Sequence, residues 1–382
     1  MRILVLLRLA LLAAAVVLPG AVSAEAVPYG LSETVLTVEA SADGVGELEV
    51  TVYRPRGDGP FPLMIVNHGR APAPASTQPR YRPQHVAYEF VRRGYAVVVP
   101  MRQGFSRSGG VDRVASCDPV ADARHQARSV RRAVHWAAQQ PWADAQRVVV
   151  MGQSHGGLAA LAYGEDPLPG TRLIVNFAGG VREPGCEAWQ SGLVEAFGEL
   201  GKAAQLPSLW FYGDNDSHFP PEVWRAAYQR HTAAGARATL EAFGRFGDDA
   251  HRLFGAREGL RIWLPPLAAR LAELGLPARV DPGLDPMPDL PAGPPLRKVE
   301  AGDADRLPIR SVSAREAFLD WLRIEEPKAF VISEDRRHWA SAWGPVRPAG
   351  RAIERCERLA ATRCRIYAVD DALVWPLGSG GN

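Results

Sequence analysis

A Gly-Gln-Ser-His-Gly motif at residues 152–156 lies between an apolar, β-branched run at 148–151 and a run of small residues at 157–162. This order predicts a buried strand, a sharp turn and a helix. So tight a turn holds Ser154 in a strained backbone conformation, and the positions two before and two after it must be small. We therefore expect the Ser154 hydroxyl at the top of a sheet, close to helix N–H groups that can stabilise an oxyanion.

The composition is that of a soluble globular protein with a large core. The chain has 382 residues, of which 47% are hydrophobic and 23% are charged. It carries 44 basic and 42 acidic residues, and the first 24 residues hold two of the arginines and no acid. The remainder is balanced in charge, which predicts no nucleic-acid partner and no polybasic membrane surface.

The N-terminus has the pattern of a secretory signal peptide. Arg2 and Arg8 precede an apolar core at 9–18, which Pro19-Gly20 interrupts, and small residues lead to a cleavage site after Ala24. A membrane anchor is the alternative, but the core is about half of the ~20 residues that a spanning helix needs. We expect export after cleavage of residues 1–24, to the periplasm or outside the cell, and no membrane span in the mature form.

Export places the four cysteines in an oxidising compartment. Cys117 and Cys186 lie in the larger N-terminal part, and Cys356 and Cys364 lie near the C-terminus. Pairing within each part is the simplest arrangement, although three connectivities and buried free thiols stay open. No His/Cys spacing is typical of a zinc site, so we expect no metal and no cofactor.

Strand and helix patterns alternate over residues 25–276 and predict an α/β domain, a mostly parallel sheet covered by helices on both faces. The expected strands lie at 34–39, 47–53, 63–67, 95–99, 147–151, 173–177, 208–212 and 239–243. The expected helices lie at 84–93, 119–140, after Ser154, at 221–234 and at 257–274.

A Pro-rich linker at 277–297 and a small α+β domain at 298–382 are expected to follow. A bond between Cys356 and Cys364 would staple this small domain. Its role stays open: it covers the active-site mouth, binds an unknown partner or polymer, or stabilises the fold. The rings of its tryptophans are suited either to stacking on sugars or to packing in its own core.

A serine hydroxyl needs a base and a third group that orients the base. Asp214 and Asp216 follow one late strand, and His251 follows the next one. Of the two acids, Asp216 is better placed to reach a base on the neighbouring loop. His251 is favoured over His218 because it follows the last strand, while His218 is a candidate pocket residue.

Two backbone amides are the expected oxyanion donors. The first belongs to His155, directly after the nucleophile, and the second to Arg70, in the loop after an apolar strand that ends in Asn67-His68-Gly69. Gly69 allows a close approach of the backbone. A plain strand-end turn is the alternative, and the Arg70 side chain is also suited to binding a substrate carboxylate.

These motifs, with those at 94–100 and 102–106, occur in the order and spacing of an α/β-hydrolase. The chain most resembles the dienelactone hydrolase and prolyl-oligopeptidase-like branch, over about 34–276, with serine where dienelactone hydrolases carry cysteine. The resemblance implies an eight-stranded, mostly parallel sheet with Ser154 as nucleophile, His251 as base and Asp216 as orienting acid. It also implies hydrolysis through an acyl-enzyme.

The serine nucleophile favours a general esterase that cleaves a small-molecule carboxylic ester. One alternative is a serine peptidase of the same fold, which the short stretch of chain before the core disfavours. Another is a non-catalytic envelope or binding protein on the same scaffold, since fold does not imply activity. The complete set of Ser154, Asp216 and His251 argues against it.

Overall fold

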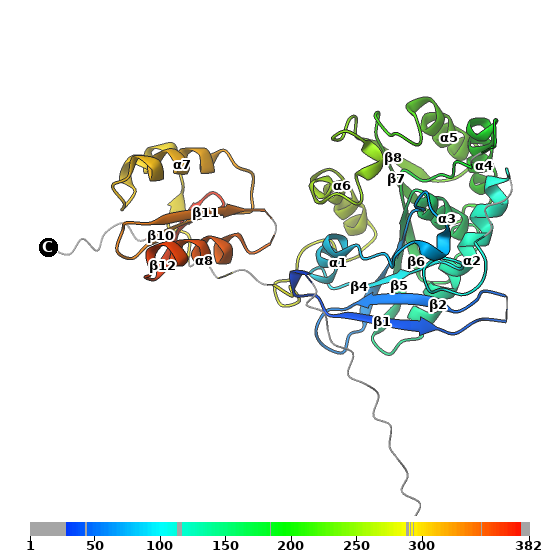
Figure 1. Ribbon diagram of the computed structural model, residues 1–382, viewed down its shortest axis with the longest axis horizontal. Helices are drawn as coiled ribbons and strands as arrows, with labels where there is room; N and C mark the ends of the chain where they lie inside the picture. The colour runs from blue at the N-terminus through cyan, green and yellow to red at the C-terminus, as the bar shows by residue number, and fades with distance from the viewer. Residues whose placement is uncertain are drawn as a thin grey trace, which may run out of the picture.

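The computed structural model describes residues 28–375, apart from 43, 113–116, 184, 288–289, 291, 293 and 345 (Figure 1). The expected leader at 1–24 lies outside the described residues. Within the part of the chain that the structure describes, no helix is long and apolar enough to span a membrane.

The larger sheet has eight strands in the order β1-β2-β4-β3-β5-β6-β7-β8. Its strands are β1 (Glu33–Val38), β2 (Leu48–Tyr53), β3 (Phe61–Asn67), β4 (Ala96–Pro100), β5 (Ala143–Gln153), β6 (Thr171–Phe177), β7 (Ser208–Tyr212) and β8 (Ala238–Ala242). The β1–β2 and β2–β4 pairs are antiparallel, and the remaining pairs are parallel. The carboxyl ends of β3 to β8 therefore lie at one edge.

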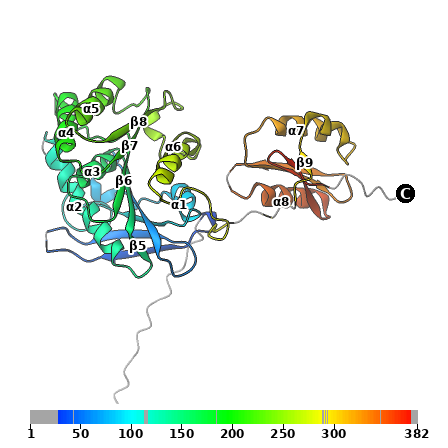
Figure 2. The ribbon, with the colours of Figure 1, turned by 180° about the vertical axis from the view of Figure 1, so that it is seen from behind.

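Helices cover both faces of this sheet, as Figures 1 and 2 show. They are α1 (Gln84–Val91), α2 (Pro119–Ala138), α3 (His155–Tyr163), α4 (Trp189–Ala203), α5 (Pro221–Ala233) and α6 (Leu260–Glu273). Successive residues of β3 alternate between two cores: Leu63 and Ile65 pack with α2 to α5, and Met64 and Val66 pack with α1 and α6. The long apolar strands reflect burial on both faces.

A second, smaller sheet is antiparallel, with five strands in the order β11-β10-β12-β13-β9. Its elements are β9 (Arg297–Lys298), α7 (Val312–Leu322), β10 (Lys328–Ser333), β11 (Trp339–Trp343), α8 (Pro348–Ala360), β12 (Cys364–Val369) and β13 (Ala372–Leu373). Helix α7 packs on one face around Phe318 and Trp321, and α8 packs on the other around Ala352 and Cys356. The result is a three-layer unit with two small cores (Figure 1).

Of the four tryptophans of this unit, Trp321 is fully buried in the core beside Phe318. Trp339 stacks on Phe330 with ring centroids 5.5 Å apart, and Trp375 packs against Tyr367. Trp343 is 47% exposed. Three of the four rings therefore contribute to packing, and Trp343 is the most exposed of them.

The four cysteines form two disulfides, one in each part of the chain. Cys117 pairs with Cys186, across 69 residues of sequence, and Cys356 pairs with Cys364. The first bond ties the start of α2 to the loop before α4. The second ties α8 to β12, as expected for a unit with small cores.

The structure differs from the sequence-based expectations mainly in helix α4, which was not predicted. Its buried residues Leu193, Ala196, Phe197 and Leu200 have helical spacing. Three glycines, at 192, 198 and 201, obscure the pattern because glycine disfavours helix interiors. The other elements of the larger sheet were predicted to within a few residues at most ends, although β5 begins at Ala143, four residues earlier than expected.

Candidate active site

Ser154 lies in the sharp turn between β5 and α3. Its backbone has φ 57° and ψ −125°, a conformation that costs a non-glycine residue energy and that tertiary packing must maintain. A Cβ on Gly152 would lie 2.1 Å from the Gly156 carbonyl oxygen, and one on Gly156 would lie 2.4 Å from that of His68. Both glycines are therefore sterically required, as the motif predicted.

Asp216 and His251 meet at the carboxyl ends of β7 and β8. The Nδ1 atom of His251 lies 3.0 Å from Oδ2 and 3.1 Å from Oδ1 of Asp216. The backbone N–H groups of His218 and Phe219 donate to Asp216 Oδ1, which fixes the carboxylate in its turn. Asp216 and His251 are 7% and 9% exposed, so their contact is largely shielded from water.

The loop of His251 is held against the Ser154 turn through Gln153. The Gln153 side-chain amide donates to the His251 carbonyl oxygen at 3.2 Å. Among the contacts of the described residues, no hydrogen bond joins the Ser154 hydroxyl directly to the His251 ring. Catalytic hydrogen bonds are often long without substrate and tighten when substrate binds.

A pocket of about 580 Å³ opens beside the nucleophile, lined by residues that include Ser154, His155, Arg70, Glu183 and His218. His218 stacks on His251 with ring centroids 4.2 Å apart. Burial, followed by the charge of His251, lowers the pKa of His218. Burial raises the pKa of Glu183.

A second pocket of about 560 Å³ shares Val181 and Glu183 with the first one and includes the disulfide cysteines 117 and 186. The two pockets therefore adjoin, and the disulfide forms part of the wall of the second one.

The loop after β3 approaches the nucleophile as expected. A Cβ on Gly69 would lie 3.3 Å from the Ser154 Cβ and 2.5 Å from the Gln153 side-chain oxygen. The side chain of the next residue, Arg70, forms an ion pair with Asp112. Gly69 therefore lies beside the turn, while the guanidinium of the next residue, Arg70, already has a carboxylate partner within the protein.

Two other acids near the candidate base, Asp214 and Asp249, have different partners. Asp214 is exposed, and its carboxylate pairs with Arg225 at 2.7 Å. Asp249 accepts from the backbone N–H groups of His251 and Ser217 and caps the short 3-10 helix Ala250–Arg252. That cap fixes the backbone of the candidate base.

One cluster of described residues has the geometry to share a metal ion. Ligand atoms of Asp216, His218 and His251 lie within 4.8 Å of one another. Two of the three are already hydrogen-bonded to each other, and the Asp216 carboxylate also accepts two backbone N–H groups. Their arrangement fits an acid–base pair, and no cofactor is needed to explain it.

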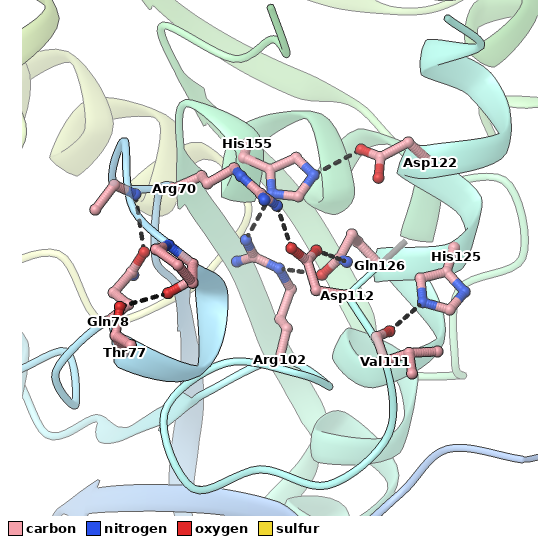
Figure 3. Close-up of polar contacts among 12 residues, drawn as sticks. Arg70, Thr77, Gln78, Arg102, Val111, Asp112, Asp122, His125, Gln126 and His155 are labelled. Atoms are coloured by element: carbon pink, nitrogen blue, oxygen red, sulfur yellow. Dashed lines mark hydrogen bonds and ion pairs between the residues drawn. The ribbon is translucent and has the colours of Figure 1, made fainter. Parts of the chain in front are cut away.

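Sequence patterns did not predict a buried polar network that lies below the turn. Arg102 follows β4 and contacts the side chain of His155, which in turn contacts Asp122 of α2 (Figure 3). On α2, the buried polar residues Asp122, His125, Gln126 and Ser129 share helical spacing. That polar stripe, beside the apolar one, was the available signal.

The family model of the X-Pro dipeptidyl-peptidases, the S15 family, matches residues 43–241, just over half of the chain. This range includes Ser154 and Asp216 but ends before His251. No curated protein matches the chain.

Solved structures with a similar fold include hydrolases of several descriptions. A candidate dienelactone hydrolase from Klebsiella pneumoniae subsp. pneumoniae is 19% identical, over 63% of this chain and 99% of its own, with a TM-score of 0.44. An acylaminoacyl peptidase from Pyrococcus horikoshii is 15% identical, over 65% and 42%, with a TM-score of 0.49. An esterase from Pyrococcus furiosus is 15% identical, over 64% and 90%, with a TM-score of 0.44.

Proposed function

We propose that this chain, which belongs to the X-Pro dipeptidyl-peptidase (S15) family, is a serine hydrolase that cleaves carboxylic esters with a Ser154–His251–Asp216 triad. The observation that carries the proposal is the Asp216–His251 hydrogen bond at 3.0 Å, beside the strained turn of Ser154. A buried acid that orients a histidine next to such a serine is the arrangement that nucleophilic catalysis requires.

The reaction begins when His251 accepts the Ser154 proton and the serine oxygen attacks the ester carbonyl carbon. The carbonyl oxygen becomes an oxyanion. Asp216 stabilises the protonated His251, which then donates its proton to the leaving alcohol. The acyl group remains on Ser154 until water, activated by His251 in the same way, releases the acid and regenerates the serine.

The backbone N–H groups of His155 and Arg70 are the proposed oxyanion donors. His155 begins α3, so its N–H belongs to the positive end of the helix dipole. Gly69 brings the loop that carries Arg70 against Ser154. Each such donor is worth about 3 kcal/mol of transition-state stabilisation.

Peptide hydrolysis is the second candidate, and the family match favours it because S15 is a peptidase family. The same three residues serve both reactions. An amide requires stronger protonation of its leaving nitrogen than an ester requires of its leaving oxygen. The preference for esters or amides therefore depends on how well His251 reaches that atom.

Export of the protein is also part of the proposal. The two disulfides support it, since such bonds persist in oxidising compartments. The smaller α+β unit is proposed as a stabilising or partner-binding addition.

Matched substrate pairs separate the two candidate reactions. The purified enzyme is assayed with nitrophenyl esters and nitroanilides that carry the same acyl group, from acetyl to aminoacyl-prolyl. We expect the ratio of kcat/KM for a short acyl ester to kcat/KM for its anilide to exceed the ratio of their intrinsic reactivities. The rates of hydroxide-catalysed hydrolysis of the two substrates give that second ratio. A preference for the aminoacyl-prolyl anilide would instead make the protein a peptidase, and turnover of neither series would contradict the proposal.

A further inference from the structure

Two segments carry the proposed oxyanion donors, the loop after β3 and the start of α3. Both contact one buried side chain, that of Arg102. Arg102 lies two residues after the end of β4 and has no solvent exposure. Figure 3 shows its guanidinium between the loop after β3 and the start of α3. The proposed triad chemistry does not use this side chain.

On one side Arg102 holds His68, the residue before Gly69 and Arg70. Its Nη1 donates to the His68 carbonyl oxygen at 2.5 Å, and its backbone N–H donates to His68 Nε2 at 3.1 Å. Because Nε2 accepts a hydrogen bond, the proton of the neutral ring lies on Nδ1, which donates to the Gly69 carbonyl oxygen at 2.7 Å. These three bonds fix the backbone of the loop up to Gly69.

The far side of the same loop is held by Gln78. Its side chain donates to the Gly69 carbonyl oxygen at 3.1 Å and accepts from the backbone N–H of Ala71 at 2.8 Å. The peptide groups before and after Arg70 are therefore both restrained.

On the other side Arg102 holds His155, whose backbone N–H is the first proposed donor. The Nη2 atom of Arg102 lies 3.2 Å from His155 Nδ1, and His155 Nε2 lies 2.6 Å from Asp122 Oδ2. The acceptor carboxylate places the ring proton on Nε2, which leaves Nδ1 to accept from Arg102. Burial lowers the pKa of both His68 and His155, so both rings stay neutral and keep these tautomers near neutral pH.

The third guanidinium nitrogen of Arg102 is also hydrogen-bonded. Its Nε donates to the Gln126 side-chain oxygen at 2.8 Å. Burial lowers the pKa of Arg102 to about 9, opposed by the charges of Asp122 and Asp112, so the guanidinium remains protonated at neutral pH. Burying a charge is costly, and apolar residues fill such space at no electrostatic cost. The electrostatic cost of burying this guanidinium indicates that Arg102 has a role other than packing.

We propose that Arg102 is a positioning residue that sets the separation of the two oxyanion donors, by bonding the His68 carbonyl and the His155 ring with one guanidinium. This inference rests on the proposed function. Removal of an oxyanion donor lowers kcat by about 10²–10³-fold. Loss of the Arg102 contacts would leave both donors in place but less well positioned. We expect this to lower kcat by roughly 10–100-fold, with KM changed little.

The test compares Arg102→Lys, which keeps the charge but not the forked geometry, with Arg102→Gln. Gln126→Leu removes the acceptor of Arg102 Nε and the hydrogen bond from Gln126 to Asp112, leaves the contacts of Arg102 with His68 and His155, and serves as a milder variant. Arg124→Gln is the matched control, because Arg124 is an exposed arginine on α2 that pairs with Glu165 outside the network. Each rate is divided by the concentration of active sites, titrated with a fluorophosphonate.

The specific readout is the rate ratio between an oxygen ester and the thionoester of the same acid and alcohol. Sulfur accepts hydrogen bonds poorly, so a tight oxyanion site discriminates strongly between them. We expect both Arg102 variants to lower kcat per active site and to reduce this ratio at least about 5-fold. Gln126→Leu is expected to give a smaller change in the same direction, and Arg124→Gln no change.

An unchanged ratio, or activity lost only in proportion to the loss of folded, titratable protein, would show that Arg102 has a packing role alone and would overturn the inference. Failure of the proposed function is a different result. In that case the wild-type enzyme would not turn over the oxygen ester, or Ser154→Ala would do so equally well.

Discussion

Ser154→Ala is expected to lower kcat for a short-chain nitrophenyl ester by about 10⁶-fold, while substrate binding is retained. The magnitude follows from nucleophile removal in serine hydrolases, where the remaining groups give only a residual acceleration over water. The turn should persist in the variant, because its backbone conformation is held by the packing of Gly152 and Gly156 and by the hydrogen bonds of the Ser154 backbone to Phe177 and Gly180. The measurement is steady-state hydrolysis, with circular dichroism as a check on folding.

Ser313→Ala is the matched control for this substitution, since Ser313 is an exposed residue of α7 in the smaller unit. It should leave kcat and KM unchanged. Retention of full turnover by Ser154→Ala would show that another group is the nucleophile.

Asp216→Asn is expected to lower kcat by about 10³–10⁴-fold at neutral pH with little change in KM. The asparagine oxygen can still accept from the backbone N–H groups of His218 and Phe219, so the turn is preserved. Its amide group then faces His251 Nδ1 as a donor and favours the tautomer with the proton on Nε2. A ring protonated at Nε2 cannot accept the serine proton.

Asp214→Asn makes the same chemical change two residues away and serves as the control. Asp214 is exposed, and its carboxylate pairs with Arg225 rather than with a histidine. Its substitution should leave the rate within about 2-fold of wild type, since exposed ion pairs contribute little. A larger loss for Asp214→Asn than for Asp216→Asn would contradict the assignment of the orienting acid.

Local sequence patterns were sufficient to predict the α/β architecture and to propose the candidate triad. The strand and helix periods alternate in order, and small residues flank Ser154 where the turn requires them. The carboxyl ends of parallel strands meet at one edge, so the order of Ser154, Asp216 and His251 places their loops together. The contact of Asp216 with His251 agrees with this reasoning. The catalytic roles and the domain boundaries stay predictions.

The buried network around Arg102 could not be derived in the same way. Arg102 is 34 residues from His68 and 53 from His155, and no local period links them. They meet only because β4 and β5 both pair with β3, which places the ends of the three strands together. The tautomers of His68 and His155 likewise depend on tertiary contacts that sequence spacing does not encode.

The most direct test of the proposed triad is mass-spectrometric mapping of a fluorophosphonate adduct on the wild-type protein and on His251→Ala. We predict one adduct in the wild type, on the peptide that contains Ser154, and labelling at least about 100-fold slower in His251→Ala, because the base that activates the serine is absent. An adduct on a different residue, no adduct at all, or equal labelling rates for the two proteins would contradict the catalytic role of Ser154 and His251.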